Sequence, residues 1–143
     1  MKFENYMAME IPSKSLNESF ARTAVACFAA QMDPTLDELG DIKTAVSEAV
    51  TNCIVHAYPD TLGQISIRCR ILKDRVLDVV IKDKGVGIAD LDQARKPTFT
   101  TGGPDRSGMG ITIMETFMSE LHIHSQPGKG TTVHMRRKLA HKK

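Results

Sequence analysis

The pentapeptide DKGVG at residues 83–87 decides how this sequence is interpreted, because of the residues that lie on either side of it. Upstream, the segment SEAVTNCIVHAY carries Glu48, Asn52 and His56 at intervals of four. Downstream, the tripeptide GMG at residues 108–110 opens an apolar stretch with a helical pattern. The D-x-G-x-G pattern alone is weak evidence, since glycine makes up about 7% of residues in average proteins. Three such motifs in this order, each on suitable local structure, are far harder to obtain by chance.

The composition indicates one globular domain over residues 1–143. Of the 143 residues, 41% are hydrophobic and 25% charged, and 19 basic against 17 acidic residues give a net charge of +2. This balance argues against nucleic acid as a direct partner, and no apolar stretch approaches the roughly 20 residues that span a membrane. Cys27, Cys53 and Cys69 lie far apart among apolar neighbours. They are expected to be small buried side chains in a reducing cytoplasm, not a disulfide or zinc framework.

The N-terminal half predicts one strand and two helices. Alternating residues at 7–11 indicate a strand that Pro12 ends. Ser15 and Glu18 have the spacing of a capping box that would start the first helix. The face expected to pack comprises Phe20, Ala24, Cys27 and Phe28. A longer helix is expected after Pro34, running to about His56. Its apolar stripe comprises Ile42, Ala45, Val46, Ala49, Val50 and Cys53.

The C-terminal half predicts four strands and one short helix. Strict alternation at 65–71 indicates a half-buried strand, and a turn at 73–74 leads into its hairpin partner at 76–82. A helix is expected from Gly110 to about Met118, followed by strands near 121–125 and 131–137. These elements predict an α/β (α+β) two-layer sandwich, with a mixed, mostly antiparallel sheet and its helices on one face. Residues 88–107 lack a clear period and are too long for an ordinary loop, which favours a functional segment.

The four-residue spacing of Glu48, Asn52 and His56 places them along one edge of the second helix. A carboxylate there suits a general base, and an amide oxygen suits Mg²⁺, which prefers oxygen ligands and is held jointly with phosphates. The alternative is an ordinary solvated helix edge, which the two glycine motifs make less favoured. His56 remains open between a site residue and a residue that complements the helix dipole.

Asp83 is expected to end a strand, where its carboxylate can accept a hydrogen bond from the amino group of adenine. Guanine has a carbonyl at that position, so the same carboxylate would discriminate against it. Gly85 and Gly87 allow close approach of the backbone and tolerate positive φ. The alternative is a plain hairpin turn, in which aspartate and glycine are also common.

The GMG tripeptide would give the last helix an N-terminus able to bind an anion. Gly108, Met109 and Gly110 would supply backbone N–H groups, with Ser107 and Arg106 just before them. Arg106 is placed to meet a γ-phosphate by a charge-assisted hydrogen bond. His122, His124 and His134 can share one face of the last two strands, and a solvated polar face is favoured over a metal site there.

These motifs together resemble the ATP site of the GHKL superfamily, which includes DNA gyrase, MutL and the histidine kinases. The likeness covers nearly the whole chain and is greatest to the small anti-sigma factor serine kinases, in particular those of sporulation. It implies the Bergerat ATP-binding fold, ATP and Mg²⁺ as cofactors, Asn52 as metal position, and a lid at about 88–107. It also implies that the hydroxyl of Thr131 supports the adenine site. The glycine-rich GGPD at 102–105 lacks a lysine that relatives often have.

The resemblance further implies a homodimer that binds a sporulation sigma factor of the sigma F type. Such a protein phosphorylates a serine of an anti-anti-sigma factor, with Glu48 as general base. Arg22, on the polar side of the first helix, is the leading candidate for partner contact; a solvated charge is the alternative. Two other classes stay open: a sigma-binding module that uses ATP without phosphotransfer, and a detached ATPase domain of a histidine kinase. The sequence leaves open which sigma factor is bound and with what nucleotide affinity.

Overall fold

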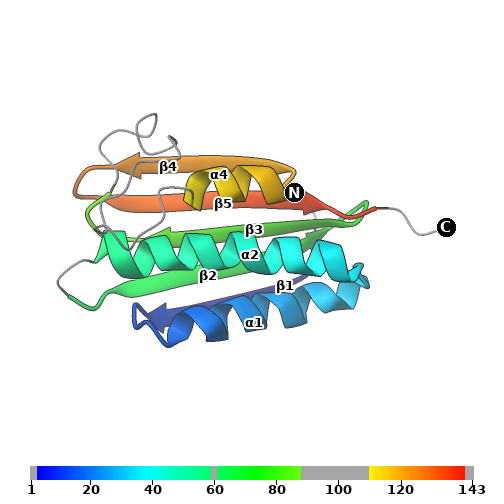
Figure 1. The fold of residues 1–143 in the computed structure, drawn as a ribbon, viewed down its shortest axis with the longest axis horizontal. Helices are drawn as coiled ribbons and strands as arrows, with labels where there is room; N and C mark the ends of the chain where they lie inside the picture. The colour runs from blue at the N-terminus through cyan, green and yellow to red at the C-terminus, as the bar shows by residue number, and fades with distance from the viewer. Residues whose placement is uncertain (1–2, 59–60, 88–109, 141–143) are drawn as a thin grey trace.

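A computed structural model describes residues 3–58, 61–87 and 110–140, which form a sheet of five strands covered by three α-helices on one side (Figure 1). No helix in these ranges is long and apolar enough to cross a membrane. The elements in chain order are β1 Phe3–Pro12, α1 Asn17–Ala29, η1 Ala30–Met32, α2 Leu36–Asn52, η2 Cys53–Ala57, β2 Gln64–Leu72, β3 Val76–Asp83, α4 Gly110–Phe117, β4 Glu120–Gln126 and β5 Gly130–Lys138. The predicted α/β two-layer architecture is confirmed.

The sheet has the strand order β1-β2-β3-β5-β4, and each neighbouring pair of these described strands is antiparallel. The sequence had predicted a mixed sheet, and this part of the prediction is wrong. Strands β3 and β4 do run in the same direction, but β5 lies between them and pairs antiparallel with both. The insertion of β5 therefore removes the parallel contact that the order of elements allowed.

Helix α2 lies between α1 and α4 and packs along the middle of the sheet (Figure 1). Its N-terminus carries a capping box that the sequence analysis missed: Thr35 Oγ1 accepts from the Glu38 N–H at 3.1 Å, and Glu38 Oε1 accepts from the Thr35 N–H at 2.9 Å. Such a box satisfies two backbone donors that the helix leaves free. The predicted apolar stripe of α2 is buried along its whole length. This burial fixes which edge of α2 remains available to a site.

The predicted capping box of α1 is wrong. Helix α1 begins at Asn17 without a side-chain cap, and Ser15 accepts the Glu18 N–H through its backbone carbonyl at 3.2 Å. The Glu18 carboxylate instead accepts a hydrogen bond from the Ser47 hydroxyl of α2 at 2.7 Å. The predicted cap does not form because the Glu18 carboxylate makes a contact between two helices. The spacing of residues within one helix does not reveal such a contact.

The predicted packing face of α1 is also largely wrong. Phe20 and Cys27 are exposed, and Ala24 is half-buried. The face that packs on the core comprises Ala21, Val25, Phe28 and Ala29. Cys53 and Cys69 are buried as predicted, whereas Cys27 is not. Apolar residues surround most of this helix, so its sequence alone did not define one face.

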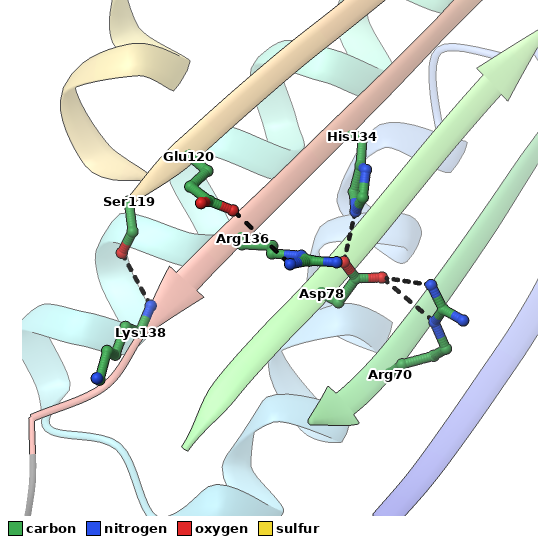
Figure 2. A network of polar contacts seen from close by, with 7 residues as sticks. All are labelled: Arg70, Asp78, Ser119, Glu120, His134, Arg136 and Lys138. Carbon is green, nitrogen blue, oxygen red and sulfur yellow. Dashed lines mark hydrogen bonds and ion pairs between the residues drawn. The ribbon is translucent and has the colours of Figure 1, made fainter. Parts of the chain in front are cut away.

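The helix-free face of the sheet carries a charged network centred on Asp78 (Figure 2). Leu77 and Val79 belong to the core, so the strand alternation directs Asp78 to the opposite face. Its carboxylate is fully buried and contacts Arg70, His134 and Arg136. Burial by itself would raise the pKa of the Asp78 carboxyl, but hydrogen bonds from His134 and Arg136 outweigh it and lower that pKa.

The same network includes His134, one of the three histidines of the last two strands. His134 is held by Asp78, and it lies directly opposite His122 in the β4–β5 register. Within the described ranges, no group of three or more His, Cys, Asp or Glu side chains is arranged to hold a metal ion. His122 and His124 are exposed and His134 is half-buried, which is the placement that a polar face requires.

Candidate nucleotide-binding site

Asp83 ends β3 as predicted and lies almost fully buried. One carboxylate oxygen, Oδ1, accepts the Gly85 N–H at 3.0 Å and the Thr131 N–H at 3.1 Å. The other oxygen, Oδ2, faces the Cys53 thiol at 3.5 Å, which is a weak donor. Oδ1 is thus used by the protein itself, whereas Oδ2 keeps the capacity to accept a further hydrogen bond. An adenine amino group requires an acceptor of this kind.

The two glycines after Asp83 let the loop pack against neighbouring backbone. A Cβ on Gly85 would lie 2.1 Å from the carbonyl oxygen of Ala57, and the Val86 N–H donates to that same oxygen at 3.0 Å. Gly87 has φ +77°, and a Cβ there would lie 2.1 Å from the Gln126 carbonyl oxygen. Positive φ is therefore observed at Gly87 but not at Gly85, and both glycines approach backbone of the protein itself, so the predicted approach to a nucleotide stays a prediction. Both glycines hold the loop that carries Asp83.

The C-terminal end of α2 continues as a π-helix, η2, which the sequence did not predict. Wider turns of this kind are rare and occur frequently at functional sites. Here the turn directly follows Asn52 and supplies the Ala57 carbonyl that holds the loop after β3. His56 lies half-buried in this turn, so the regular four-residue spacing ends at Asn52. A role of His56 in the site stays a prediction.

The start of α4 lies against the predicted edge of α2. A Cβ placed on Gly110 would lie 3.1 Å from Glu48 Oε2 and 3.5 Å from Asn52 Oδ1. The last glycine of the GMG motif thus keeps open the space in front of these two side chains. Two of the three sequence motifs meet at this point. The other predicted residues of the motif, Arg106, Ser107, Gly108 and Met109, lie outside the described residues, as does the lid expected at 88–107.

The Glu48 carboxyl is half-buried, and its pKa is raised by burial and, to a smaller extent, by the negative charge of Glu18. A carboxyl with a raised pKa is a better proton acceptor near neutral pH. Asn52 is half-buried beside it and offers a neutral oxygen. Magnesium takes few protein ligands when phosphates supply the others. The donor set and the space left by Gly110 therefore fit a magnesium ion held jointly with phosphate.

Thr131 reaches the site through its backbone. Its N–H donates to Asp83, while its hydroxyl shares a 2.8 Å hydrogen bond with the hydroxyl of Ser125. Gly130, with φ +92°, brings this strand start close to Asp83, because a Cβ there would lie 2.2 Å from the Asp83 carbonyl oxygen. The resemblance had assigned the hydroxyl of Thr131 to the adenine site. In the structure the contact between Thr131 and Asp83 is made by the amide.

Three residues that sequence reasoning missed support the site. Cys53 donates its thiol toward Asp83, and burial raises its pKa well above the ordinary value, so it stays protonated. The Tyr58 hydroxyl accepts the Lys84 N–H at 2.7 Å and donates to the Gln64 carbonyl at 2.9 Å. Glu18 acts on Glu48 from another helix. Only Cys53 had a signal in the sequence, since it lies one helical turn after the buried Ala49.

The comparisons with known proteins agree with this arrangement. The family profile described as histidine kinase-like ATPase domain matches residues 12–137. A protein of Caldanaerobacter subterraneus subsp. tengcongensis named anti-sigma F factor is 57% identical over 136 residues, which are 94% of each chain. An anti-sigma F factor of Bacillus licheniformis is 50% identical over 142 residues, covering 98% of this chain and 97% of the relative.

Solved structures show the same fold at lower identity. The RsbU and RsbW domains of Rv1364c from Mycobacterium tuberculosis match with a TM-score of 0.72 and 18% identity, over 97% of this chain and 34% of that one. The histidine kinase domain of a blue-light activated histidine kinase from Erythrobacter litoralis EL346 matches with a TM-score of 0.59 and 21% identity, over 90% of this chain and 62% of that one. The chain therefore belongs to the histidine kinase-like ATPase domain family and, within it, to the family of the anti-sigma F factors.

Proposed function

We propose that this protein is an anti-sigma factor that binds and inhibits a sporulation sigma factor of the sigma F type. Using ATP and Mg²⁺, it phosphorylates a serine of an anti-anti-sigma factor. The observation that carries the proposal is the meeting of three groups around the C-terminal end of α2. They are the Asp83 carboxylate, the Glu48–Asn52 edge and the open position at Gly110. The names and high identity of the relatives support the choice of partners.

In this proposal each residue has one task. Asp83 Oδ2 accepts a hydrogen bond from the adenine amino group, while Oδ1 keeps the loop in place. Asn52 is the protein ligand of Mg²⁺, which neutralises charge on the phosphates. Glu48 accepts the proton of the serine hydroxyl while the serine oxygen takes the γ-phosphoryl group and ADP leaves. Transfer of this kind depends mainly on positioning and electrostatics.

The partner surface is proposed to include Arg22 on α1. Its side chain is 37% exposed, and the exposed apolar side chains of Leu16 and Phe20 belong to the same stretch of chain. A charged group beside exposed apolar side chains is common at protein interfaces. Arg22→Glu should weaken binding of both the sigma factor and the anti-anti-sigma factor in calorimetry. If both bind the variant normally, Arg22 is only a solvated charge.

The proposal includes a homodimer. The helix-free face of the sheet offers a surface for it, since Val80 and Ala8 line a shallow hollow of about 460 Å³ between charged side chains. Sedimentation equilibrium should give twice the mass of the chain at micromolar concentration. A monomer at all concentrations would remove this part of the proposal.

Glu48 separates phosphoryl transfer from binding. Glu48→Ala should bind ATP with Mg²⁺ and hold the sigma factor, yet transfer phosphate to the anti-anti-sigma serine about 10²–10⁴-fold more slowly. Asn52→Ala should lose Mg²⁺-dependent ATP binding as well as transfer. Glu4→Ala, an exposed carboxylate on β1, is the matched control and should behave as wild type.

Single-turnover transfer from labelled ATP is the measurement. An unchanged rate for Glu48→Ala would show that Glu48 is not the base. If the wild type transfers phosphate to no protein, the binding module without phosphotransfer becomes the better interpretation.

A further inference from the structure

Glu18 joins two helices that have different tasks in the proposed function. Its Oε1 accepts a hydrogen bond from the Ser47 hydroxyl on α2 at 2.7 Å, across 29 positions of sequence. Its Oε2 lies 3.4 Å from Arg22 Nε on α1. One carboxylate thus contacts both the proposed partner-binding arginine and the residue directly before Glu48.

The two contacts of Glu18 differ in quality. The bond to Ser47 is short and charge-assisted, which places it among the stronger hydrogen bonds. The contact with Arg22 is an ion pair in which neither Glu18 Oε2 nor Arg22 Nε makes a hydrogen bond within the described residues, although both atoms are covered. The Arg22 side chain is 37% exposed, so an acidic group on a bound protein can reach its guanidinium and compete with Glu18 for it, while the bond to Ser47 persists.

The position of Ser47 makes this exchange relevant to phosphoryl transfer. Ser47 lies in the same helical turn as Glu48 and is half-buried at the α1–α2 contact. Burial is the main cause of the raised pKa of the Glu48 carboxyl, and the negative charge of Glu18 is the second cause. A new contact at Arg22 can consequently affect Glu48, the proposed base, through the Glu18 carboxylate and the Ser47 hydroxyl.

We propose that Glu18 is a positioning residue for phosphoryl transfer. When an acidic group of the bound protein contacts Arg22, Glu18 transmits this change through Ser47 to the turn of α2 that carries Glu48. This inference rests on the proposed function, because it requires Glu48 to act in transfer and Arg22 to contact the partner. It adds a route by which the bound protein acts on the rate of its own phosphorylation. Energetic coupling along such side-chain networks typically changes a rate or affinity by about 2- to 30-fold.

Ser47→Ala tests the link to α2, with Ser47→Thr as the conservative variant that keeps the hydroxyl. In single-turnover transfer at saturating protein substrate, Ser47→Ala should lower the maximal rate about 2- to 30-fold. Its ATP affinity and its KM for the protein substrate should stay at wild-type values, and Ser47→Thr should restore the rate. Loss of the bond to Glu18 lowers the unfolding free energy in either case, but a purely structural role would also weaken ATP binding together with the rate.

Arg22→Ala tests the coupling. In the wild-type background it should change both KM and maximal rate, whereas in the Ser47→Ala background it should change KM alone, because the link is already broken. Equal effects of Arg22→Ala on the maximal rate in both backgrounds would overturn the inference, as would a wild-type maximal rate for Ser47→Ala. In either case a wild type that transfers phosphate leaves the proposed function intact. Absence of transfer by the wild type would overturn the proposed function and this inference with it.

Discussion

Asp83→Asn separates recognition of adenine from stability of the fold. The amide oxygen of the new side chain can take the place of Oδ1 and keep the hydrogen bonds from Gly85 and Thr131. Its NH₂ group then replaces Oδ2, so an adenine amino group meets a donor in place of an acceptor. The loss of one charge-assisted hydrogen bond costs about 1.5–3 kcal/mol, which weakens ATP binding about 10- to 150-fold.

Asp83→Ala should behave differently, and the contrast follows from the same contacts. Alanine leaves the part-buried backbone N–H groups of Gly85 and Thr131 without an acceptor. A fully buried group of this kind costs about 1–3 kcal/mol, so the unfolding free energy should fall by at most about 2–6 kcal/mol. Asparagine should change the unfolding free energy far less, since both donors keep a partner.

Calorimetric titration with ATP and GTP, together with denaturant unfolding, measures both effects. Asp83→Asn should also lose preference for ATP over GTP, because its NH₂ group can donate to the guanine carbonyl. Asp74→Asn is the matched control, since it lies in the β2–β3 turn with φ 64°, a conformation that asparagine tolerates. ATP affinity within about twofold of wild type for Asp83→Asn would refute the assignment, since one lost hydrogen bond to a charged group costs more.

The remaining predictions concern stability and the loop after β3. Asp78→Asn should destabilise the fold by about 3 kcal/mol near neutral pH, because Arg70 and Arg136 lose the buried carboxylate that they contact. The folded-state pKa of Asp78 is lowered, so its contribution to the unfolding free energy is complete above the unfolded pKa of about 3.9 and is lost as the pH falls towards the folded pKa. Denaturant unfolding at several pH values should show the difference in unfolding free energy between wild type and Asp78→Asn shrinking below this pKa. A difference that stays constant across pH would contradict this prediction. Thr35→Ala should cost about 1 kcal/mol, with Thr35→Ser as wild type in thermal melts. Gly85→Ala should lower the melting temperature, since its Cβ would lie 2.1 Å from the Ala57 carbonyl oxygen. Gly40→Ala, where a Cβ meets nothing within 4 Å in α2, should raise stability by about 1 kcal/mol.

The helices and strands were predicted correctly where only one face of the element is buried and its sequence is therefore periodic. The alternation in β2 and the stripe of α2 were predicted correctly, because burial on one side imposes a period on the sequence. In α1 the apolar residues lie around most of the helix, so Phe20 and Cys27 were predicted to pack and are exposed. The strand order was not derivable in the same way. Whether β5 pairs with β3 depends on contacts between segments far apart in sequence.

The site could be predicted only where its residues lie close together along the chain. Glu48 and Asn52 share a helix edge, and the structure places Gly110 beside them. Glu18 lay beyond any such pattern, since it reaches α2 from another helix. The π-helix after Asn52 was equally hidden, because its sequence differs little from that of an ordinary helix end. Long-range contacts thus set the surroundings of Glu48, while local spacing alone singled it out as the proposed base.

Strand β1 has a consequence for the chain during its synthesis. It is made before the other described elements, yet its partner β2 begins only at Gln64, so each paired residue follows about fifty to seventy positions later. At roughly 5–20 residues per second, β1 waits about 3–12 s for its hydrogen-bonding partner on the ribosome. During that time Met7, Met9 and Ile11 have no sheet to cover them. Glu10 and Pro12 at the end of this edge strand are features that discourage pairing with another chain. Glu10 and Pro12 thus lower the tendency of β1 to aggregate during the interval before β2 is made.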